Sequence, residues 1–278
     1  ALNVSAVLID FVGFYDIITI LVITSALLST SDFIIHIKSI IMNFKCKWSA
    51  NLVILICITL TNFLIAQKIT EPYDFPVKPG TPEWKELKSG DEMAEVCQVP
   101  QGILDSMTVE ALVLTCINYP LLGSIMASNN VHEGLDLLIP HSNCLQKLVT
   151  QKDADEILVE EYSKIKLREK SIDVPNYKDF NLEVLLTHPN ILDNMNDVLL
   201  HKLKGFVYRN LIGKINRSDL YGRISVENNA YILMKLLNRQ GHGPELVSLS
   251  KAQDIEIFEQ NGQFCSEELL QAIINLGK

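Results

Sequence analysis

Residues 112–121 have the sequence LVLTCINYPL, and the placing of its apolar side chains predicts a helix. These side chains recur at the spacing that puts them on one face of an α-helix; they are Leu112, Val113, Cys116 and Ile117. Pro120 follows, and proline suits the first turn of a helix because it lacks the N–H that later turns use. The stretch therefore predicts a short amphipathic helix and a second element that begins near the proline.

The same helical spacing continues along the chain from residue 91. Prolines at positions 100, 120 and 140 each precede an apolar cluster, which predicts a new short helix after each of them. Longer helices are predicted over residues 153–168, 194–212, 226–238 and 267–275. Weak strand patterns occur at residues 222–226 and 246–249. The sequence therefore predicts an all-α fold of stacked short helices, arranged as solenoid-like helix pairs or as an irregular bundle.

A proline-rich segment, residues 67–90, precedes these helices. Proline opposes both helix interiors and the hydrogen bonding of strands, so its density here predicts an extended arm. Three aromatic residues lie in the arm and are expected to pin it onto the helices that follow: Tyr73, Phe75 and Trp84. Because aromatic residues also anchor protein interfaces, the three are a possible interaction arm as well.

Residues 42–66 have the order of a secretory signal peptide. A basic start is followed by an apolar run over residues 51–65, and the small residue Ala66 precedes the expected cleavage point. An uncleaved N-terminal anchor is the alternative, because Leu64 occupies a position where cleavage favours a small residue.

Residues 1–41 are expected to be an upstream extension that is not part of the mature protein, because Met42 is the first methionine. The alternative is a transmembrane hairpin, in which Asp16 would lie at membrane depth, where an acidic side chain is costly without a partner. The predicted domains are therefore the extension (1–41), the signal peptide or anchor (42–66), the arm (67–90) and the helical domain (91–278).

The chain has 278 residues and a net charge of −9, and this charge lies entirely on residues 67–278. Residues 1–66 contribute three basic and three acidic residues, and their apolar content raises the mean hydropathy of the chain to +0.19. Nucleic-acid binding depends on Lys and Arg that neutralise phosphates. The densest basic stretch, residues 164–170, lies among the glutamates Glu160, Glu161 and Glu169, which is typical of a solvated helix face. We therefore expect no nucleic-acid partner.

Four cysteines lie in the part that is predicted to be exported: Cys97, Cys116, Cys144 and Cys265. An even number of cysteines in an oxidising compartment favours disulfides, and four cysteines allow three pairings. Unpaired cysteine is also among the most buried residue types and packs as a small apolar side chain. The sequence leaves both possibilities open.

His141 and Cys144 are the strongest catalytic candidates in the sequence. They lie one helical turn apart near an expected helix start, where a thiolate is favoured. Chance placement on a helix surface is the alternative, because no oxyanion-hole motif accompanies the pair. His132 lacks the second histidine of a zinc-protease motif and is interpreted as a solvated surface residue. The sequence predicts no metal and no other cofactor.

Three segments resemble the opening of a group of exported Bacteroidetes-type proteins of unknown function. They are KPGTPEW at residues 78–84, CQVP at residues 97–100 and LVLTCINYPL at residues 112–121. The resemblance extends over most of residues 70–278 and is clearest in the first 80 of them. It implies export and a helical domain, and it implies no activity.

These observations together predict an exported, non-catalytic interaction or scaffold protein that acts through a helical surface. Its expected location is the periplasm, the cell surface or the exterior, and its expected partner is a protein or a component of the cell envelope. Membrane contact is expected only through an uncleaved N-terminal segment. The alternatives are a secreted hydrolase that uses His141 and Cys144, and a small-ligand carrier, which would need a large cavity.

Overall fold

Helices dominate the part of the chain that the computed structural model describes, residues 68–168 and 177–278. Within those residues there is no strand, and an isolated bridge joins Ile69 to Met107. The prediction of an all-α fold is confirmed. The predicted extension and signal segment, residues 1–66, lie outside the described residues. No helix among the described residues is long and apolar enough to cross a membrane.

The helices follow one another closely along the chain. In order they are η1 (Glu83–Glu86), α4 (Gly90–Val96), α5 (Gln101–Ser106), α6 (Val109–Ile117), η2 (Leu122–Ala127), α7 (Val131–Leu138), η3 (Ile139–His141), α8 (Asn143–Leu148), α9 (Ala154–Ser163), α10 (Lys178–Leu186), α11 (Pro189–Leu192), α12 (Asp197–Ile215), α13 (Arg223–Arg239), α14 (Gly243–Leu249), α15 (Ala252–Asn261) and α16 (Glu267–Gly277).

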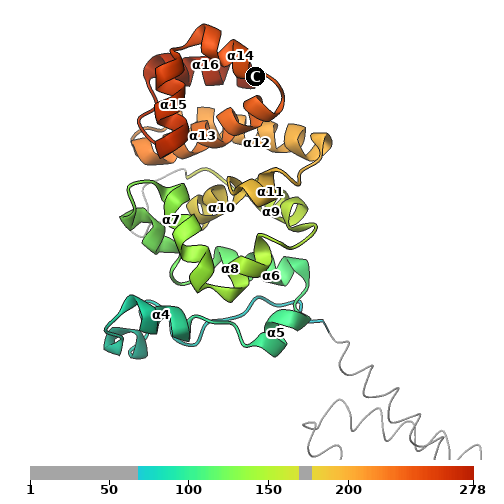
Figure 1. Ribbon diagram of the computed structural model, residues 1–278, viewed down its shortest axis with the longest axis vertical. Coiled ribbons are helices and arrows are strands. Elements are labelled where there is room, and N and C mark those ends of the chain that lie inside the picture. The colour runs from blue at the N-terminus through green and yellow to red at the C-terminus, as the bar shows by residue number, and fades with distance from the viewer. Residues whose placement is uncertain (1–67, 169–176) are drawn as a thin grey trace, which may run out of the picture. The chain divides into compact units, whose positions relative to one another are not determined.

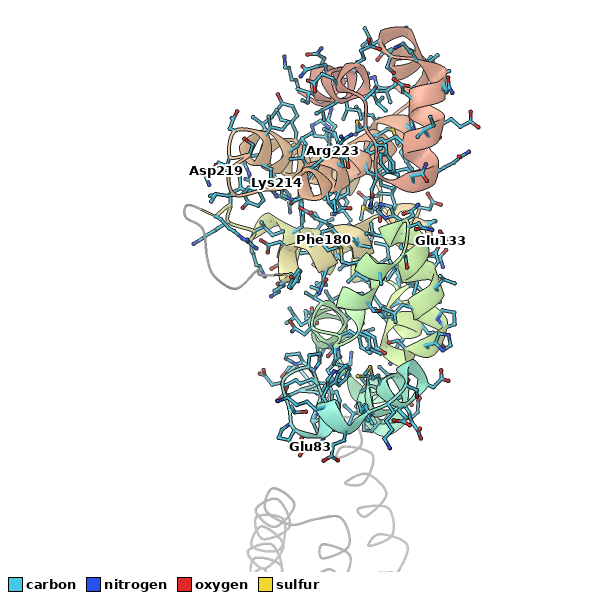
Figure 2. All side chains as sticks on the ribbon, turned by 90° about the vertical axis from the view of Figure 1, so that its left-hand side faces the viewer. Glu83, Glu133, Phe180, Lys214, Asp219 and Arg223 are labelled. Atoms are coloured by element: carbon cyan, nitrogen blue, oxygen red, sulfur yellow. The ribbon has the colours of Figure 1, made fainter. Side chains whose placement is uncertain are left out.

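These helices are stacked in chain order within one compact unit, residues 66–278. α4 and α5 lie at one end of the stack, α6 to α11 follow, and α12 to α16 form the other end (Figure 1). Side chains fill the space between the helices (Figure 2). Helix α10 is central, because it packs against α6, α7, α9 and α13. The predicted stacked arrangement is therefore present.

Local signals determine where many of these helices begin. Pro100 directly precedes α5, Pro140 lies in η3 just before α8, and Pro120 lies shortly before η2, as the spacing predicts. Other helices begin at a residue whose side chain accepts a hydrogen bond from an N–H of the first turn, which has no partner inside the helix. These capping residues are Ser89, Thr108, Asn130, Ser142, Asn196 and Ser266.

The four longer predicted helices correspond to α9, α12, α13 and α16. α9 ends early, at Ser163, and residues 164–168 are not helical, so the interpretation of the basic stretch as a helix face is wrong there. After Ser163, basic and apolar residues alternate one by one, and this pattern forms no continuous apolar stripe on a helix. The two weak strand patterns are also wrong predictions, because residues 222–226 lead into α13 and residues 246–249 belong to α14.

Replacing Asn196 with alanine should destabilise the protein by about 1 kcal/mol, since its side chain caps the longest described helix. Asn196 Oδ1 accepts a hydrogen bond from Leu199 N at 2.9 Å. Urea denaturation followed by circular dichroism measures the change. Asn196→Ser is the matched control, because serine also caps helices and should preserve most of the stability. Equal losses in both variants would contradict the capping role.

The arm lies against the helices, and its aromatic side chains make the contact. Phe75 is only 2% exposed, and its ring meets the rings of Tyr73 and Tyr119 edge to face at centroid distances of 5.0 and 5.7 Å. Tyr73 N donates to Thr115 Oγ1 at 2.9 Å, which ties the arm to α6. Trp84 is half-buried against the core. Phe75 is therefore a core residue, and as long as the arm stays docked its ring is not available to a partner.

Candidate functional site

A cleft of about 540 Å³ lies among α7, the turn between α10 and α11, α13 and α15. Four segments that are far apart in the sequence meet at this place. Apolar side chains of Leu135 and Leu192 contribute to the walls, together with charged and aromatic side chains. Since the charged groups decide what the cleft can bind, their geometry is described one group at a time.

His132 lies in the wall of the cleft and is held in a neutral form. Thr187 Oγ1 donates to Val184 O at 2.6 Å, so the same oxygen accepts from His132 Nδ1, 2.8 Å away. The ring proton therefore lies on Nδ1, and Nε2 carries a lone pair. Nε2 is buried and has no hydrogen-bond partner among the described residues. Burial, with a smaller effect of the nearby Lys235, lowers the pKa of His132 to about 4.

The ring of His132 is stacked on Tyr231, with the centroids 4.2 Å apart and the planes 18° from parallel. Lys235 Nζ lies over the same tyrosine ring, 5.1 Å from its centroid. The interpretation of His132 as a solvated surface residue is therefore wrong. The ring contacts residues at the end of α10 and on α13. The sequence around His132 does not reveal these contacts, because they come from distant parts of the chain.

His188, the residue after Thr187, is a second histidine that lines the cleft. Its Nδ1 accepts from Asn190 N at 3.2 Å and so caps α11. Its Nε2 lies 3.8 Å from Asp136 Oδ1 on α7. Burial lowers the pKa of His188, and the nearby Asp136 opposes this shift. At neutral pH the ring is therefore neutral, and its Nε2–H lies near the Asp136 carboxylate.

Two cations, one helical turn apart on α13, stand at the rim of the cleft. Arg239 Nη1 donates to Asp193 Oδ1 at 2.7 Å, and Lys235 Nζ lies 3.9 Å from Glu259 Oε1. The side chains of both cations are 31% exposed. Asn238 Nδ2 also donates to Glu259 Oε1, at 3.0 Å. The rim therefore offers paired charges of both signs that remain accessible to a ligand.

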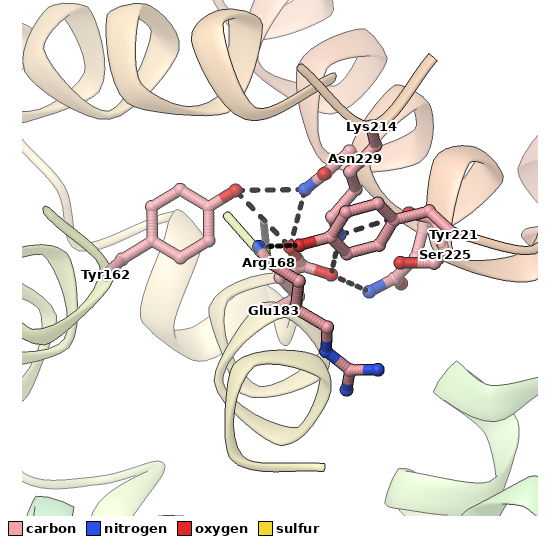
Figure 3. Close-up of polar contacts among 8 residues, drawn as sticks. Tyr162, Arg168, Glu183, Lys214, Tyr221, Ser225 and Asn229 are labelled. Carbon is pink, nitrogen blue, oxygen red and sulfur yellow. Dashed lines mark hydrogen bonds and ion pairs between the residues drawn. The ribbon is translucent and has the colours of Figure 1, made fainter. Parts of the chain in front are cut away.

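A buried polar cluster lies beneath α13, around the carboxylate of Glu183 on α10. Lys214 Nζ donates to both carboxylate oxygens, at 2.7 and 3.0 Å, and Asn229 Nδ2 donates at 2.8 Å (Figure 3). Asn228 Nδ2 adds a fourth hydrogen bond at 3.0 Å. The amide of Asn229 also donates to the hydroxyl of Tyr162 at 2.9 Å, and burial raises the pKa of that hydroxyl well above its ordinary value. The cluster is closed to solvent, so we assign it a structural role.

The residues singled out in the sequence are not brought together in this cleft. His141 is exposed, whereas the side chain of Cys144 is fully buried and its sulfur lies 3.2 Å from Ser142 Oγ. A substrate on the surface can reach the first side chain but not the second. The geometry therefore gives the hydrolase alternative no support.

The four cysteines of the described residues are free and buried. Burial raises the pKa of Cys116 well above its ordinary value, and it raises the pKa of Cys97 to about 11. Cys265 lies elsewhere, with its N–H donating to Glu227 Oε1 at 3.0 Å. Of the two possibilities that the sequence leaves open, the described structure has the buried thiol. Within the described residues, no group of three His, Cys, Asp or Glu side chains could hold a metal ion.

Sequence reasoning missed the cleft because its residues are separated by long stretches of chain. His132 and Tyr231 are stacked in space, yet α8 to α12 separate them in the sequence. One signal was available: Lys235 and Arg239 are two cations four residues apart, in and just after the apolar run of α13 over residues 230–237.

Neither a protein-family model, nor a curated protein, nor a solved structure matches this chain.

Proposed function

We propose that the chain is an exported, non-catalytic interaction protein that binds a protein partner, or a component of the cell envelope, through the cleft and its rim. The observation that carries this proposal is the rim itself: Arg239 and Lys235 are paired with carboxylates but remain partly exposed. The rim of a macromolecular interface is polar, and complementary charges there steer binding and fix its register. Export is supported by the composition of residues 42–66.

The burial of the reactive groups also supports a binding function. Nucleophilic catalysis needs an accessible thiolate beside a base. The thiols of the described residues are buried, and the two histidines of the cleft are neutral and engaged in structural hydrogen bonds. The hydroxyl that His132 contacts, that of Thr187, is buried and donates to Val184 O.

A small-ligand carrier is a second candidate, and the size of the cleft favours it. A volume of about 540 Å³ falls within the range of roughly 300–1,000 Å³ that is typical of small-molecule sites. A rim variant and its control distinguish the two candidates, because the measurement reports loss of a captured partner or loss of a bound small molecule.

Reversing both rim charges, in Lys235→Glu/Arg239→Glu, should weaken capture of the native partner at least about tenfold, because each new carboxylate would face Glu259 or Asp193. The full chain, tagged and produced in its host, is cross-linked and quantified against wild type. Lys251→Glu is the control, since Lys251 pairs with Glu268 away from the cleft. Unchanged capture by the rim variant would refute the proposed site. A small molecule seen by native mass spectrometry and lost only in the rim variant would favour the carrier.

A further inference from the structure

His132 occupies the point where four elements of the cleft meet. It belongs to α7, hydrogen-bonds to Thr187 after α10, and stacks on Tyr231 of α13. The fourth neighbour is Gly262 at the end of α15, which approaches so closely that a Cβ built there would lie 2.8 Å from His132 Nε2. Gly262 has a φ of 64°, a conformation that glycine adopts without strain.

This junction accepts only the neutral ring. A second proton would go to Nε2, where the described residues provide no acceptor. Asn130 Oδ1 also lies at this junction, 3.5 Å from a Cβ built on Gly262, and it already accepts from His132 N at 2.8 Å, while Asn130 Nδ2 donates to Gln260 O of α15. A new N–H at Nε2 would therefore meet the backbone at the end of α15 instead of a hydrogen-bond partner.

Charge opposes protonation as well. The titratable groups around the ring are Asp136 of α7, His188 of the α10–α11 turn, Tyr231 and Lys235 of α13, and Glu259 of α15. Lys235 lies over the same tyrosine ring that His132 stacks on, so an imidazolium would repel it. Asp136 Oδ1 lies 3.8 Å from His188 Nε2, and Glu259 Oε1 accepts from Asn238 Nδ2 at 3.0 Å.

We propose that His132 is an acid-sensitive latch of the cleft: its neutral ring holds α7, α13 and the end of α15 together, and protonation releases the end of α15. In a released state the ring would titrate near 6.5, whereas burial lowers its pKa to about 4 in the closed state. The closed state is therefore fully favoured above pH 6.5 and loses its advantage as the pH falls toward 4. The difference corresponds to a shift of roughly 300-fold in the closed-to-released equilibrium across this window.

One consequence of the latch, the release of a bound partner in acid, rests on the proposed function, whereas the latch itself does not. It is tested on the full chain without any partner, so that its failure is distinct from failure of the proposed function. Nuclear magnetic resonance follows the Cε1–H signal of His132 and the hydrogen-exchange protection of Gln260 to Gly262 between pH 7 and pH 4. We expect a titration midpoint well below 6 and a loss of protection of up to roughly 300-fold, after correction for intrinsic exchange.

His132→Asn is the decisive variant, because the asparagine amide can still donate to Thr187 but cannot be protonated. Its protection at the end of α15 should be insensitive to pH over this range. His201→Asn, at an exposed position on α12, should behave as wild type does. A wild-type midpoint near 6.5, or an equal pH dependence in His132→Asn, would overturn the latch. If His132→Asn does not fold, the wild-type titration midpoint alone decides.

Discussion

Replacing Lys214 with methionine should destabilise the protein by about 3–5 kcal/mol, one of the two largest single-residue effects that we expect. The side chains of Lys214 and Glu183 are only 4% and 1% exposed, and their charged atoms lie 2.7 Å apart. Methionine fills most of the volume of lysine, so the loss of stability measures the effect of removing the charge. It leaves the carboxylate of Glu183 in the core with amide donors from Asn228 and Asn229 but without the Lys214 ammonium that pairs with it.

Thermal and urea denaturation measure this effect. For a unit of this size, such a loss corresponds to a fall in Tm of roughly 6–20 °C. Lys164→Met is the matched control, because Lys164 pairs with Glu160 and Glu161 on the surface, where ion pairs contribute about 1 kcal/mol or less. Glu183→Gln and the double variant complete a mutant cycle, and the double variant should lose less than the sum of the single losses. Losses that simply add would mean that the two charges do not depend on each other.

The sequence could not predict this pair, because lysine and glutamate on helices are normally exposed. Lys214 lies in the last turn of the long amphipathic helix α12, and Glu183 lies in α10 among buried leucines. One signal was available: residues 226–237 have the sequence VENNAYILMKLL, in which two asparagines occupy the apolar face of a helix. Buried asparagines need hydrogen-bond partners, so this pattern indicates a polar cluster but not which residues complete it.

What the sequence did predict depends on local interactions. Helical spacing and prolines lie within a few residues of the structure that they determine, so the all-α fold and the starts of α5, α8, α9 and α16 could be inferred. The cleft depends instead on which helices meet. His132 illustrates the difference: its neighbours in the sequence indicate a helix surface, and its buried contacts come from three other elements.

The aromatic arm shows the same difference between what the local sequence predicts and what depends on contacts with other elements. Its prolines predicted extended chain, and its aromatics were expected to contact the helices. Tyr73 and Phe75 do so, and the arm is tied further by hydrogen bonds of Ile69 with Ser106 O and Thr108 N, at 2.8 and 2.9 Å. Whether the arm stabilises the fold or binds a partner depends on how much of each ring is buried, which composition alone does not indicate.

Replacing Phe75 with alanine should therefore destabilise the protein by about 3–5 kcal/mol, as truncation of a buried aromatic residue typically does. Its ring is almost fully buried between Tyr73 and Tyr119, and alanine would leave a cavity between the arm and α6. We also expect the arm to detach more often, because its other anchors are single hydrogen bonds and half-buried rings. Urea denaturation measures the loss of stability, and limited proteolysis measures how often residues 68–86 become accessible.

Trp84→Ala provides the contrast, because Trp84 is half-buried and its removal leaves part of the cavity open to water. It should cost less than Phe75→Ala and leave the first part of the arm protected from protease. If the arm acted chiefly as an interaction segment, the order would reverse: Trp84→Ala would impair partner capture at unchanged stability, and Phe75→Ala would leave the free energy of unfolding unchanged. A stable Phe75→Ala variant would contradict the docked arm directly, since a ring that is 2% exposed cannot be removed from a core without cost.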